Sequence, residues 1–273
     1  MKKDIYVDAD HIIYFVSMAN SHKSPFDEID GDFKDDTYKV PLKPFKKHFK
    51  ELIKEYYETV EVESAFHDWK PGKMHIIFSD PKGNFRYDIF PDYKSGRDQE
   101  KGKIFYRLRK WAHKKYGYAK HVEADDIVCY HARKGAIVIT TDKDVYKGSH
   151  GMFFDAHLDH RRWITTTQEE AERFTLLQTL AGDASDSIPG LPGVGITTAE
   201  KLLGDNPTWG TVVTLYQGKA LHDGPPFYTK AGKESALLKR LQEANLTEED
   251  AILTRRLVGM DQYDGKEIKL WQP

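Results

Sequence analysis

The chain has 273 residues, with 41 Lys and Arg against 43 Asp and Glu, a net charge of −2 and 39% hydrophobic residues. This length and composition predict a globular protein of one large or two modest domains and exclude a low-complexity chain. One cysteine excludes a disulfide framework and indicates a reducing, cytoplasmic compartment, and the lack of an 18-residue apolar run or a signal-peptide core predicts no membrane partner.

The first predicted strand ends in an acid. Residues Asp4–Asp8 (D-I-Y-V-D) predict a strand, and the apolar run Ile12–Met18 after it predicts a helix. Asp10 lies between the two, where a helix cap and a ligand role are equally good interpretations. The polar residues 21–38 predict a loop, and apolar residues at helical spacing over residues 42–66 predict an amphipathic helix that packs in the core.

An acid also follows the second predicted strand, Lys73–Ser79, since the next residue is Asp80. The carboxyl ends of parallel strands lie at the same edge of a sheet, where ligands bind in open α/β folds. We therefore expect Asp80 and Asp8 to lie at one edge.

A basic, aromatic-rich segment comes next. Residues 86–120 contain eleven Lys and Arg but four Asp and Glu, with aromatic residues between them. Lys94 and Arg97 lie in P-D-Y-K-S-G-R in the first part of this segment, and Lys101 and Lys103 follow in a helix predicted from about Asp98. A solvated helix face is the simpler interpretation, but the position between two acid-tipped strands favours a surface that binds a polyanion.

The most informative stretch is residues 122–147, V-E-A-D-D-I-V-C-Y-H-A-R-K-G-A-I-V-I-T-T-D-K-D-V-Y-K. It predicts a helix over residues 123–134, ended by Gly135, and a buried parallel strand over residues 136–141. The acids of this stretch lie at the helix start and after the strand, where period two would project the last two to the same side. These acids are Glu123, Asp125, Asp126, Asp142 and Asp144.

Several carboxylates at one edge repel each other, by about 1 kcal/mol per pair at 4 Å in water and about 4 kcal/mol at an effective dielectric of 20. Bound cations or protons must offset that repulsion. Because the acidic motifs V-E-A-D-D and T-T-D-K-D contain no His or Cys, the ligand set is all oxygen and favours Mg²⁺ or Mn²⁺ over Zn²⁺. The alternative, that each acid only caps a helix or shapes a turn, holds well for single residues and poorly for the whole set.

The second half contains a capping box and a glycine-rich hairpin. Short edge strands are predicted at residues 151–155 and 163–165, and Thr167 with Glu170 predicts the start of a helix that runs to about Gly182. In the sequence G-D-A-S-D-S-I-P-G-L-P-G-V-G that follows, Asp183 and Asp186 are spaced to reach one ion. Gly193 and Gly195 predict a tight hairpin before a helix near Thr197, which would direct backbone N–H groups at a phosphate.

The last part of the chain carries no sign of catalytic chemistry. Residues 219–239 contain Gly, Pro and Lys and predict a loop-rich region, and residues 248–258 predict a helix.

These motifs, in this order and at these distances, resemble the flap endonuclease / 5′-to-3′ exonuclease family, and most closely the stand-alone exonucleases of short-tailed T-odd bacteriophages. The motifs are V-D-A-D, F-S-D, P-D-Y-K-S-G-R, V-E-A-D-D, T-T-D-K-D and the glycine-rich hairpin. The resemblance implies an α/β fold, with a PIN-like nuclease domain around a mostly parallel sheet over residues 1–165. It also implies a basic arch near residues 84–120 and a helix-hairpin-helix DNA-binding region over residues 166–273.

The resemblance also implies roles for single residues. Asp8, Asp80, Glu123 and Asp125 match ligands of a first divalent ion, and Asp126, Asp142, Asp144, Asp183 and Asp186 match direct or water-mediated ligands of a second. Lys94 and Arg97 match the basic pair beside the scissile phosphate. Gly190, Gly193, Gly195 and Thr197 match the hairpin that grips duplex DNA and, in relatives, K⁺. Ala9, where many relatives have Gly, and the additional acid Asp10 depart from the family pattern.

The implied activity is Mg²⁺-dependent hydrolysis of duplex or 5′-flapped DNA by two ions, with Mn²⁺ as a substitute, giving 5′-phosphorylated products. The implied setting is phage DNA replication or host DNA breakdown in the host cytoplasm, with RNA–DNA hybrids and replication proteins as further expected partners. Two alternatives stay open: a PIN-type ribonuclease, which the helix-hairpin-helix stretch disfavours, and a non-catalytic DNA-binding module, which should lack some of the matched acids.

Overall fold

The computed structural model describes residues 1–19, 41–97, 101–157 and 159–273, so the loop predicted at residues 21–38 lies outside the described residues. The chain divides into two compact units, which are described separately. The first contains residues 1–82, 99–143 and 151–165, and the second contains residues 83–98, 144–150 and 166–273.

A five-stranded sheet forms the centre of the first unit, in the order β2-β1-β3-β4-β5. Its strands β1, β2, β3 and β4 are parallel where they pair, so their carboxyl ends lie at one edge. This arrangement confirms the predicted mostly parallel α/β architecture. The strands are β1 (Lys2–Asp8), β2 (Lys70–Ile77), β3 (Ile137–Thr140), β4 (Gly151–Asp155) and β5 (Arg162–Thr166).

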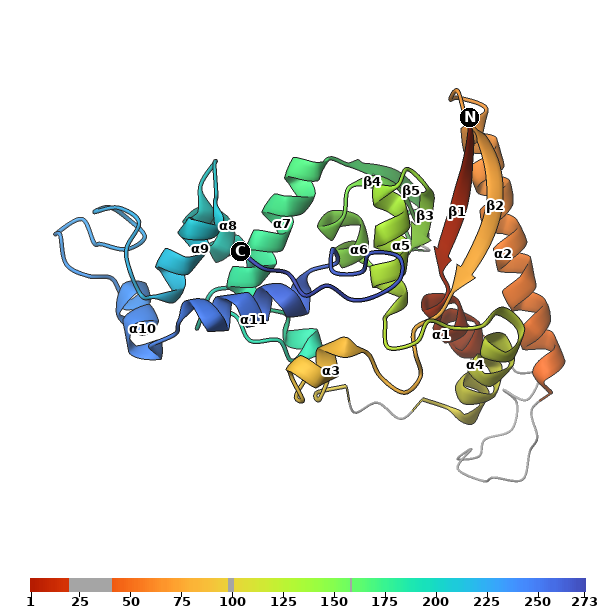
Figure 1. Ribbon diagram of the computed structural model, residues 1–273, viewed down its shortest axis with the longest axis horizontal. Coiled ribbons are helices and arrows are strands. Elements are labelled where there is room, and N and C mark those ends of the chain that lie inside the picture. The colour runs from red at the N-terminus through yellow and green to blue at the C-terminus, as the bar shows by residue number, and fades with distance from the viewer. Residues whose placement is uncertain (20–40, 98–100, 158) are drawn as a thin grey trace. The chain divides into compact units, whose positions relative to one another are not determined.

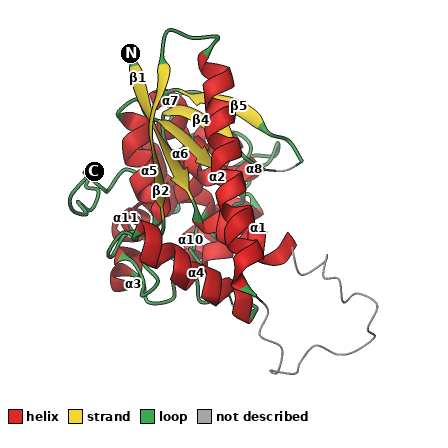
Figure 2. Cartoon of the chain, turned by 90° about the vertical axis from the view of Figure 1, so that its right-hand side faces the viewer, coloured by secondary structure: helices red, strands yellow, loops and turns green. Residues whose placement is uncertain are grey.

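Helices cover both faces of this sheet (Figures 1 and 2). The buried side chains of Ile5 and Val7 pack in a core with α1 (Asp10–Ala19), α2 (Leu42–Ser64) and α4 (Lys103–Tyr116). The intervening residue, Tyr6, points to the opposite face, where its ring stacks on that of His131 in α5 (Ala124–Arg133) with centroids 3.7 Å apart. This alternation follows from the two-residue period of a strand.

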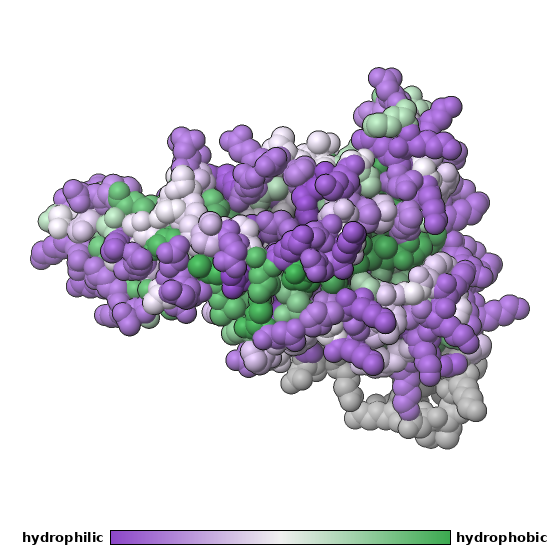
Figure 3. All heavy atoms as spheres, viewed as in Figure 1, coloured by the Kyte–Doolittle hydropathy of each residue, from purple (hydrophilic) through white to green (hydrophobic). Residues whose placement is uncertain are grey.

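The long helix α2 shows why the sequence pattern identified the helices of this unit. Its buried residues recur every three or four positions, which places them on one stripe facing the core. They are Phe45, Phe49, Leu52, Tyr56 and Val60. Hydrophilic side chains cover most of the outer surface drawn in Figure 3, and none of the described helices is long and apolar enough to cross a membrane.

The second unit is helical. Its described elements are α3 (Phe85–Ile89), α6 (Lys143–Gly148), α7 (Gln168–Ala181), the 3₁₀ turn η1 (Ala184–Asp186), α8 (Ile196–Leu203), α9 (Trp209–Tyr216), α10 (Ala236–Ala244) and α11 (Glu248–Val258). The capping box predicted at Thr167 and Glu170 is confirmed at the start of α7. Helices α3, α6, α9 and α10 were not predicted. In α9 the sequence W-G-T-V-V-T-L-Y has poor helix propensity, and buried Val212 and Leu215 hold it in the core of the unit.

A buried arginine joins α3 to the end of α11 inside the second unit. Arg86 is fully buried, and its guanidinium donates to the carbonyl oxygens of Leu257 at 2.8 Å and Gly259 at 3.0 Å. The last carbonyl groups of a helix have no partners within the helix, so this side chain satisfies groups at the end of α11 that burial would otherwise penalise.

We predict that Arg86→Leu destabilises the protein by about 2–4 kcal/mol, because it removes the guanidinium donor of the Leu257 carbonyl and leaves the Gly259 carbonyl with only a longer bond from Gln262 at 3.4 Å. Urea unfolding of the purified variant measures this. Arg107→Leu, at an exposed position on α4, is the matched control. Equal losses of unfolding free energy in the two variants would show that Arg86 does not support the second unit.

A histidine on α4 is neutral in the folded protein. The ring of His113 lies 5.1 Å from that of Phe78 and 5.0 Å from that of Tyr118. Burial, and then the charge of Arg109, lower the pKa of His113 to about 4. Because the unfolded chain binds a proton near pH 6.5 and the folded chain does not, this group's stabilising contribution is complete above pH 6.5 and is lost as the pH falls toward 4.

We therefore predict that the free energy of unfolding of His113→Gln decreases less than that of wild type as the pH falls from 6.5 to 4.5. Urea unfolding of wild type and variant at several pH values in this window gives the two slopes. The control is His67→Gln, a more exposed histidine paired with Glu63. Parallel curves for wild type and His113→Gln would exclude His113 as a source of the acid sensitivity.

Candidate active site

The acid at the end of β1 is buried and hydrogen-bonded to the end of β3. Asp8 is 6% exposed, and its Oδ2 accepts a hydrogen bond from Oγ1 of Thr140 at 3.2 Å. Its Oδ1 accepts a longer bond from the backbone N–H of Asp10 at 3.3 Å. The parallel strands β1 and β3 thus bring their carboxyl ends together, as the sequence predicted.

Asp10, the acid outside the family pattern, connects three elements of the first unit. Its Oδ2 accepts a hydrogen bond from the backbone N–H of Ser79 at 3.0 Å, just after β2. The hydroxyl of Ser79 in turn accepts from the backbone N–H of Ala124 at 2.9 Å, at the start of α5. Burial, and then the negative charge of Asp8, raise the pKa of Asp10. Asp10 therefore holds the ends of β1, β2 and α5 together beside Asp8.

Asp80 lies three residues beyond the end of β2 and is held by backbone N–H groups. Its Oδ2 accepts from His121 at 2.8 Å and its Oδ1 from Lys82 at 2.9 Å. Burial opposes ionisation of this carboxyl, but the two N–H groups outweigh it and lower the pKa of Asp80. The backbone N–H of Asp80 also donates to the carbonyl of Val122 at 3.2 Å, so Asp80 is fixed next to the residue that precedes Glu123.

Three predicted ligands gather at the start of α5. Glu123 is the N-cap residue and is 7% exposed, while Asp125 and Asp126 lie in the first turn. The side chain of Asp126 is fully buried. A helix N-terminus carries a partial positive charge that favours carboxylates at these positions. The partial positive charge at the N-terminus of α5 thus stabilises the carboxylates of Glu123, Asp125 and Asp126.

The geometry expected for Asp142 and Asp144 was wrong. Strand β3 ends at Thr140, and the backbone N–H of Asp142 turns back to donate to Oγ1 of Thr140 at 3.0 Å. Asp144 lies in the first turn of α6. A helix starts too soon after β3 for the strand period to orient the two acids, so their shared role as metal ligands stays a prediction.

In the second unit, the basic pair contacts one of the two predicted acids of the G-D-A-S-D motif, Asp186. Asp183 caps η1, and its Oδ1 accepts from the backbone N–H of Ser185 at 2.8 Å. Asp186 forms ion pairs with Arg97 and with Lys94, whose Nζ lies 3.6 Å from its Oδ2. The sequence did not predict these ion pairs, because the partners are about ninety positions apart.

A turn lies between η1 and α8, where the glycine-rich hairpin was predicted, and the glycines around it differ in their surroundings. A Cβ on Gly190 would come within 2.5 Å of backbone atoms of Ala181 and Gly182, so this glycine is needed for close packing. Gly195 is the N-cap of α8, and a Cβ there would meet nothing within 4 Å. Gly195 and Thr197 are exposed at the start of α8, an arrangement that can accept a phosphate.

The basic side chains before α4 lie beside aromatic rings in the first unit. The ammonium group of Lys101 lies 4.5 Å from the ring centre of Phe105 and 5.8 Å from that of Tyr14. Lys103 is exposed in the first turn of α4. This combination of cations and aromatic rings is typical of surfaces that bind single-stranded nucleic acid.

The donor chemistry of the first unit suits a hard divalent cation. Asp8, Glu123 and Asp126 are buried carboxylates whose mutual repulsion a cation would offset. Across the described residues, no group of three His, Cys, Asp or Glu side chains is already arranged to hold a metal ion. The assignment of these side chains as metal ligands therefore stays a prediction.

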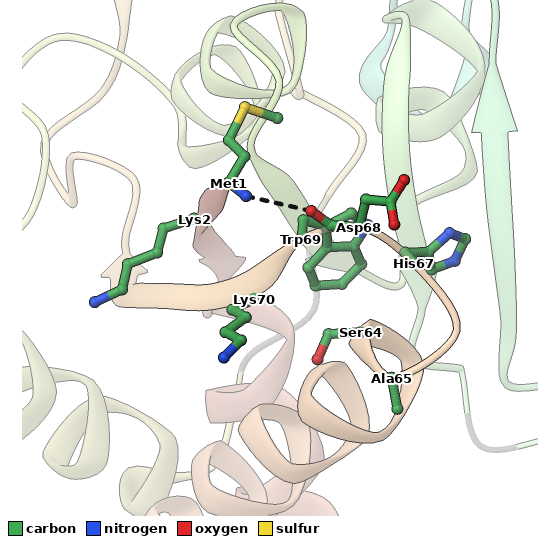
Figure 4. Close-up of a pocket in the computed structure, with 8 residues that line it drawn as sticks. All are labelled: Met1, Lys2, Ser64, Ala65, His67, Asp68, Trp69 and Lys70. Atoms are coloured by element: carbon green, nitrogen blue, oxygen red, sulfur yellow. Dashed lines mark hydrogen bonds between the residues drawn. The ribbon is translucent and has the colours of Figure 1, made fainter.

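A cavity of about 610 Å³ in the first unit lies away from these acids (Figure 4). It is lined by Met1, Lys2 and Lys70 at the amino ends of β1 and β2, together with Ser64, Ala65, His67, Asp68 and Trp69. Ligands of open α/β sheets bind at the carboxyl ends of the strands. The acids of β1 and β2, and not this cavity, are therefore the candidate active site of the first unit.

Sequence comparison finds nuclease relatives, although no family model matches the chain. The chain is 31% identical over 150 residues to the 5′-3′ exonuclease of Buchnera aphidicola subsp. Schizaphis graminum, covering 48% of this chain and 52% of that protein. It is 23% identical over 252 residues to the 5′-3′ exonuclease of Mycoplasmopsis pulmonis, covering 84% of each. The chain spans less than two thirds of the length of the first curated relatives it matches, such as 18% of DNA polymerase I of Deinococcus radiodurans.

Comparison of structures finds the same group of proteins. The bacteriophage T5 D15 flap endonuclease, in a complex with DNA and metal ions, aligns with a TM-score of 0.61 and 17% identity, covering 97% of this chain and 91% of that chain. The catalytic core of Rad2 in complex with DNA substrate aligns with a TM-score of 0.51 and 14% identity, covering 99% and 83%. The chain thus has the PIN-like fold of the 5′-nucleases, and its predicted resemblance to the flap endonuclease / 5′-to-3′ exonuclease family is confirmed.

Proposed function

We propose that this protein is a divalent-metal-dependent 5′-nuclease that hydrolyses phosphodiester bonds of duplex or 5′-flapped DNA and releases 5′-phosphorylated products. The observation that carries the proposal is the set of carboxylates at the carboxyl edge of the sheet, where buried Asp8 accepts a hydrogen bond from Thr140 and half-buried Asp80 accepts one from the backbone N–H of His121. Hydrogen bonds and protons can offset part of the negative charge of such a set, and a divalent ion would offset several charges at once.

Asp8, Asp80, Glu123 and Asp125 would hold one divalent ion, and Asp126, Asp142, Asp144, Asp183 and Asp186 are the candidates for a second. When bound, such ions polarise phosphate oxygens and lower the pKa of a bound water. The T5 5′-exonuclease, a structural relative solved with divalent zinc ions bound, supports a divalent ion. All-oxygen ligands favour Mg²⁺, with Mn²⁺ as a substitute. K⁺ at the hairpin is part of the same proposal.

The basic groups of the chain would bind the substrate. Lys94 and Arg97 are proposed to offset charge on the phosphate as the transition state forms. The exposed start of α8, with Gly195 and Thr197, would bind the backbone of the duplex. Lys101 and Lys103 would bind an unpaired 5′ strand. The DNA complexes of the T5 and Rad2 relatives support DNA as the partner. RNA–DNA hybrids and replication proteins remain further proposed partners in the cytoplasm.

The test is cleavage of a 5′-labelled flapped duplex and a blunt duplex in Mg²⁺, with EDTA as the control. We expect short labelled products in Mg²⁺, none in EDTA, and a 5′-phosphate on the remaining strand. No cleavage of either DNA in Mg²⁺ or Mn²⁺ by folded protein would refute the proposed activity.

We predict that Asp8→Asn lowers the cleavage rate by at least about 100-fold, because an amide cannot supply the negative charge that a divalent ion needs. The variant should still bind flapped DNA in EDTA, since Asp8 is buried and would not touch the duplex. Single-turnover rates and fluorescence anisotropy measure the two effects. Asp68→Asn, at the opposite end of the sheet, is the control, and wild-type cleavage by Asp8→Asn would remove the acids from the mechanism.

A further inference from the structure

The carboxylate of Asp186 is surrounded by the side chains of the P-D-Y-K-S-G-R motif in the second unit. Its Oδ2 accepts a hydrogen bond from the Tyr93 hydroxyl at 3.2 Å and lies 3.6 Å from Nζ of Lys94. Its Oδ1 is paired with the Arg97 guanidinium. The Asp186 side chain is 14% exposed, so solvent screens these contacts only in part. Both oxygens of Asp186 are therefore engaged by donors of one short segment.

The backbone around these side chains is fixed as well. The N–H of Lys94 donates to the carbonyl of Asp186 at 2.8 Å, and the N–H of Gly96 donates to Oγ of Ser187 at 3.1 Å. Lys94 and Ser187 both have positive φ, at 57° and 59°. Residues other than glycine adopt this conformation only at a cost in free energy, and it persists where surrounding contacts enforce it. The basic pair thus has a defined position relative to η1.

Asp183, the other acid of the G-D-A-S-D motif, has different hydrogen-bond partners. Asp183 Oδ1 accepts from the backbone N–H and the hydroxyl of Ser185 at 2.8 Å and 2.7 Å, and these contacts shape η1. Asp183 accepts hydrogen bonds from neutral groups of Ser185 and from the backbone N–H of Asp186, whereas the partners of Asp186 include two cations. A metal ion bound directly to Asp186 would compete with the charge of Lys94 and Arg97 for the same two oxygens.

We infer that Asp186 is a positioning residue for the basic pair: its carboxylate orients Lys94 and Arg97 toward DNA phosphate and is not a direct metal ligand. This inference rests on the proposed nuclease function. The spacing of the G-D-A-S-D motif suggested that Asp186 is a metal ligand, and this inference replaces that assignment. The assignment of Asp183 as a metal ligand does not change. By pairing with Lys94 and Arg97, Asp186 holds both cations in place before the reaction. Cations fixed in this way stabilise the negative charge that develops on the phosphate in the transition state.

The first test separates metal binding from catalysis with Asp186→Asn and Asp183→Asn. Mn²⁺ affinity is measured by electron paramagnetic resonance of the free ion, and single-turnover cleavage at saturating Mn²⁺ is measured on flapped DNA. For Asp186→Asn we expect Mn²⁺ affinity within about twofold of wild type and a cleavage rate lower by roughly 10- to 100-fold, the range typical of residues that orient a functional group. A Mn²⁺ affinity at least tenfold weaker in Asp186→Asn would overturn the inference.

The second test is a double-mutant cycle. If Asp186 acts through the basic pair, Asp186→Asn should slow cleavage little further in a Lys94→Ala/Arg97→Ala background. Fully multiplicative effects of the two changes on the rate would show that Asp186 acts elsewhere. Tyr93→Phe removes one partner of Asp186 and keeps all charges, so it should give a weaker version of the same effect, even if Asp186→Asn folds poorly.

Failure of the proposed function is distinguishable from failure of this inference. If folded wild-type protein cleaves no DNA, the proposed function fails. The contact itself is then tested by a cycle on the free energy of unfolding with Asp186→Asn and Arg97→Ala, in the absence of metal. Coupling between the two substitutions supports the positioning role, and additive losses contradict it.

Discussion

The first unit depends on keeping carboxylates together at the carboxyl edge of a parallel sheet. Asp8 and Asp10 lie two positions apart in largely buried surroundings, and the raised pKa of Asp10 shows how burial and the charge of Asp8 disfavour a second ionised group. Backbone N–H groups, the hydroxyl of Thr140 and the N-terminus of α5 offset part of that cost. The remaining repulsion is the physical basis of the proposed cation site, because a divalent ion would relieve several pairs at once.

In the second unit, charged side chains contact each other and backbone groups, and these contacts fix the positions of side chains. Arg86, fully buried, satisfies carbonyl groups at the end of α11 and so fixes α3, which leads into the P-D-Y-K-S-G-R segment. Asp186 then holds the basic residues of that segment. The position of the basic pair therefore follows from contacts within its own unit, made by residues that carry opposite or complementary charge.

The elements with clear periodicity were predictable from the sequence. Strand β1, helix α2, the capping box at Thr167 and helix α11 follow the expected patterns, because each has either a regular apolar stripe or a local cap. Helix α9 was not predictable, since its β-branched residues and glycine disfavour a helix that only tertiary packing stabilises. The acids were found by their places after strands, but the turn that carries Asp142 and the contact between Asp186 and Lys94 depend on tertiary structure.

The most direct measurement of the central claim is the effect of Mg²⁺ on thermal stability, at constant ionic strength. A cation that binds the folded acids and not the unfolded chain raises the midpoint of unfolding as its concentration increases. We predict a saturable rise for wild type and a clearly smaller rise for Asp8→Asn. A midpoint for wild type that does not change with Mg²⁺ or Mn²⁺ would contradict the claim that these carboxylates form a metal site.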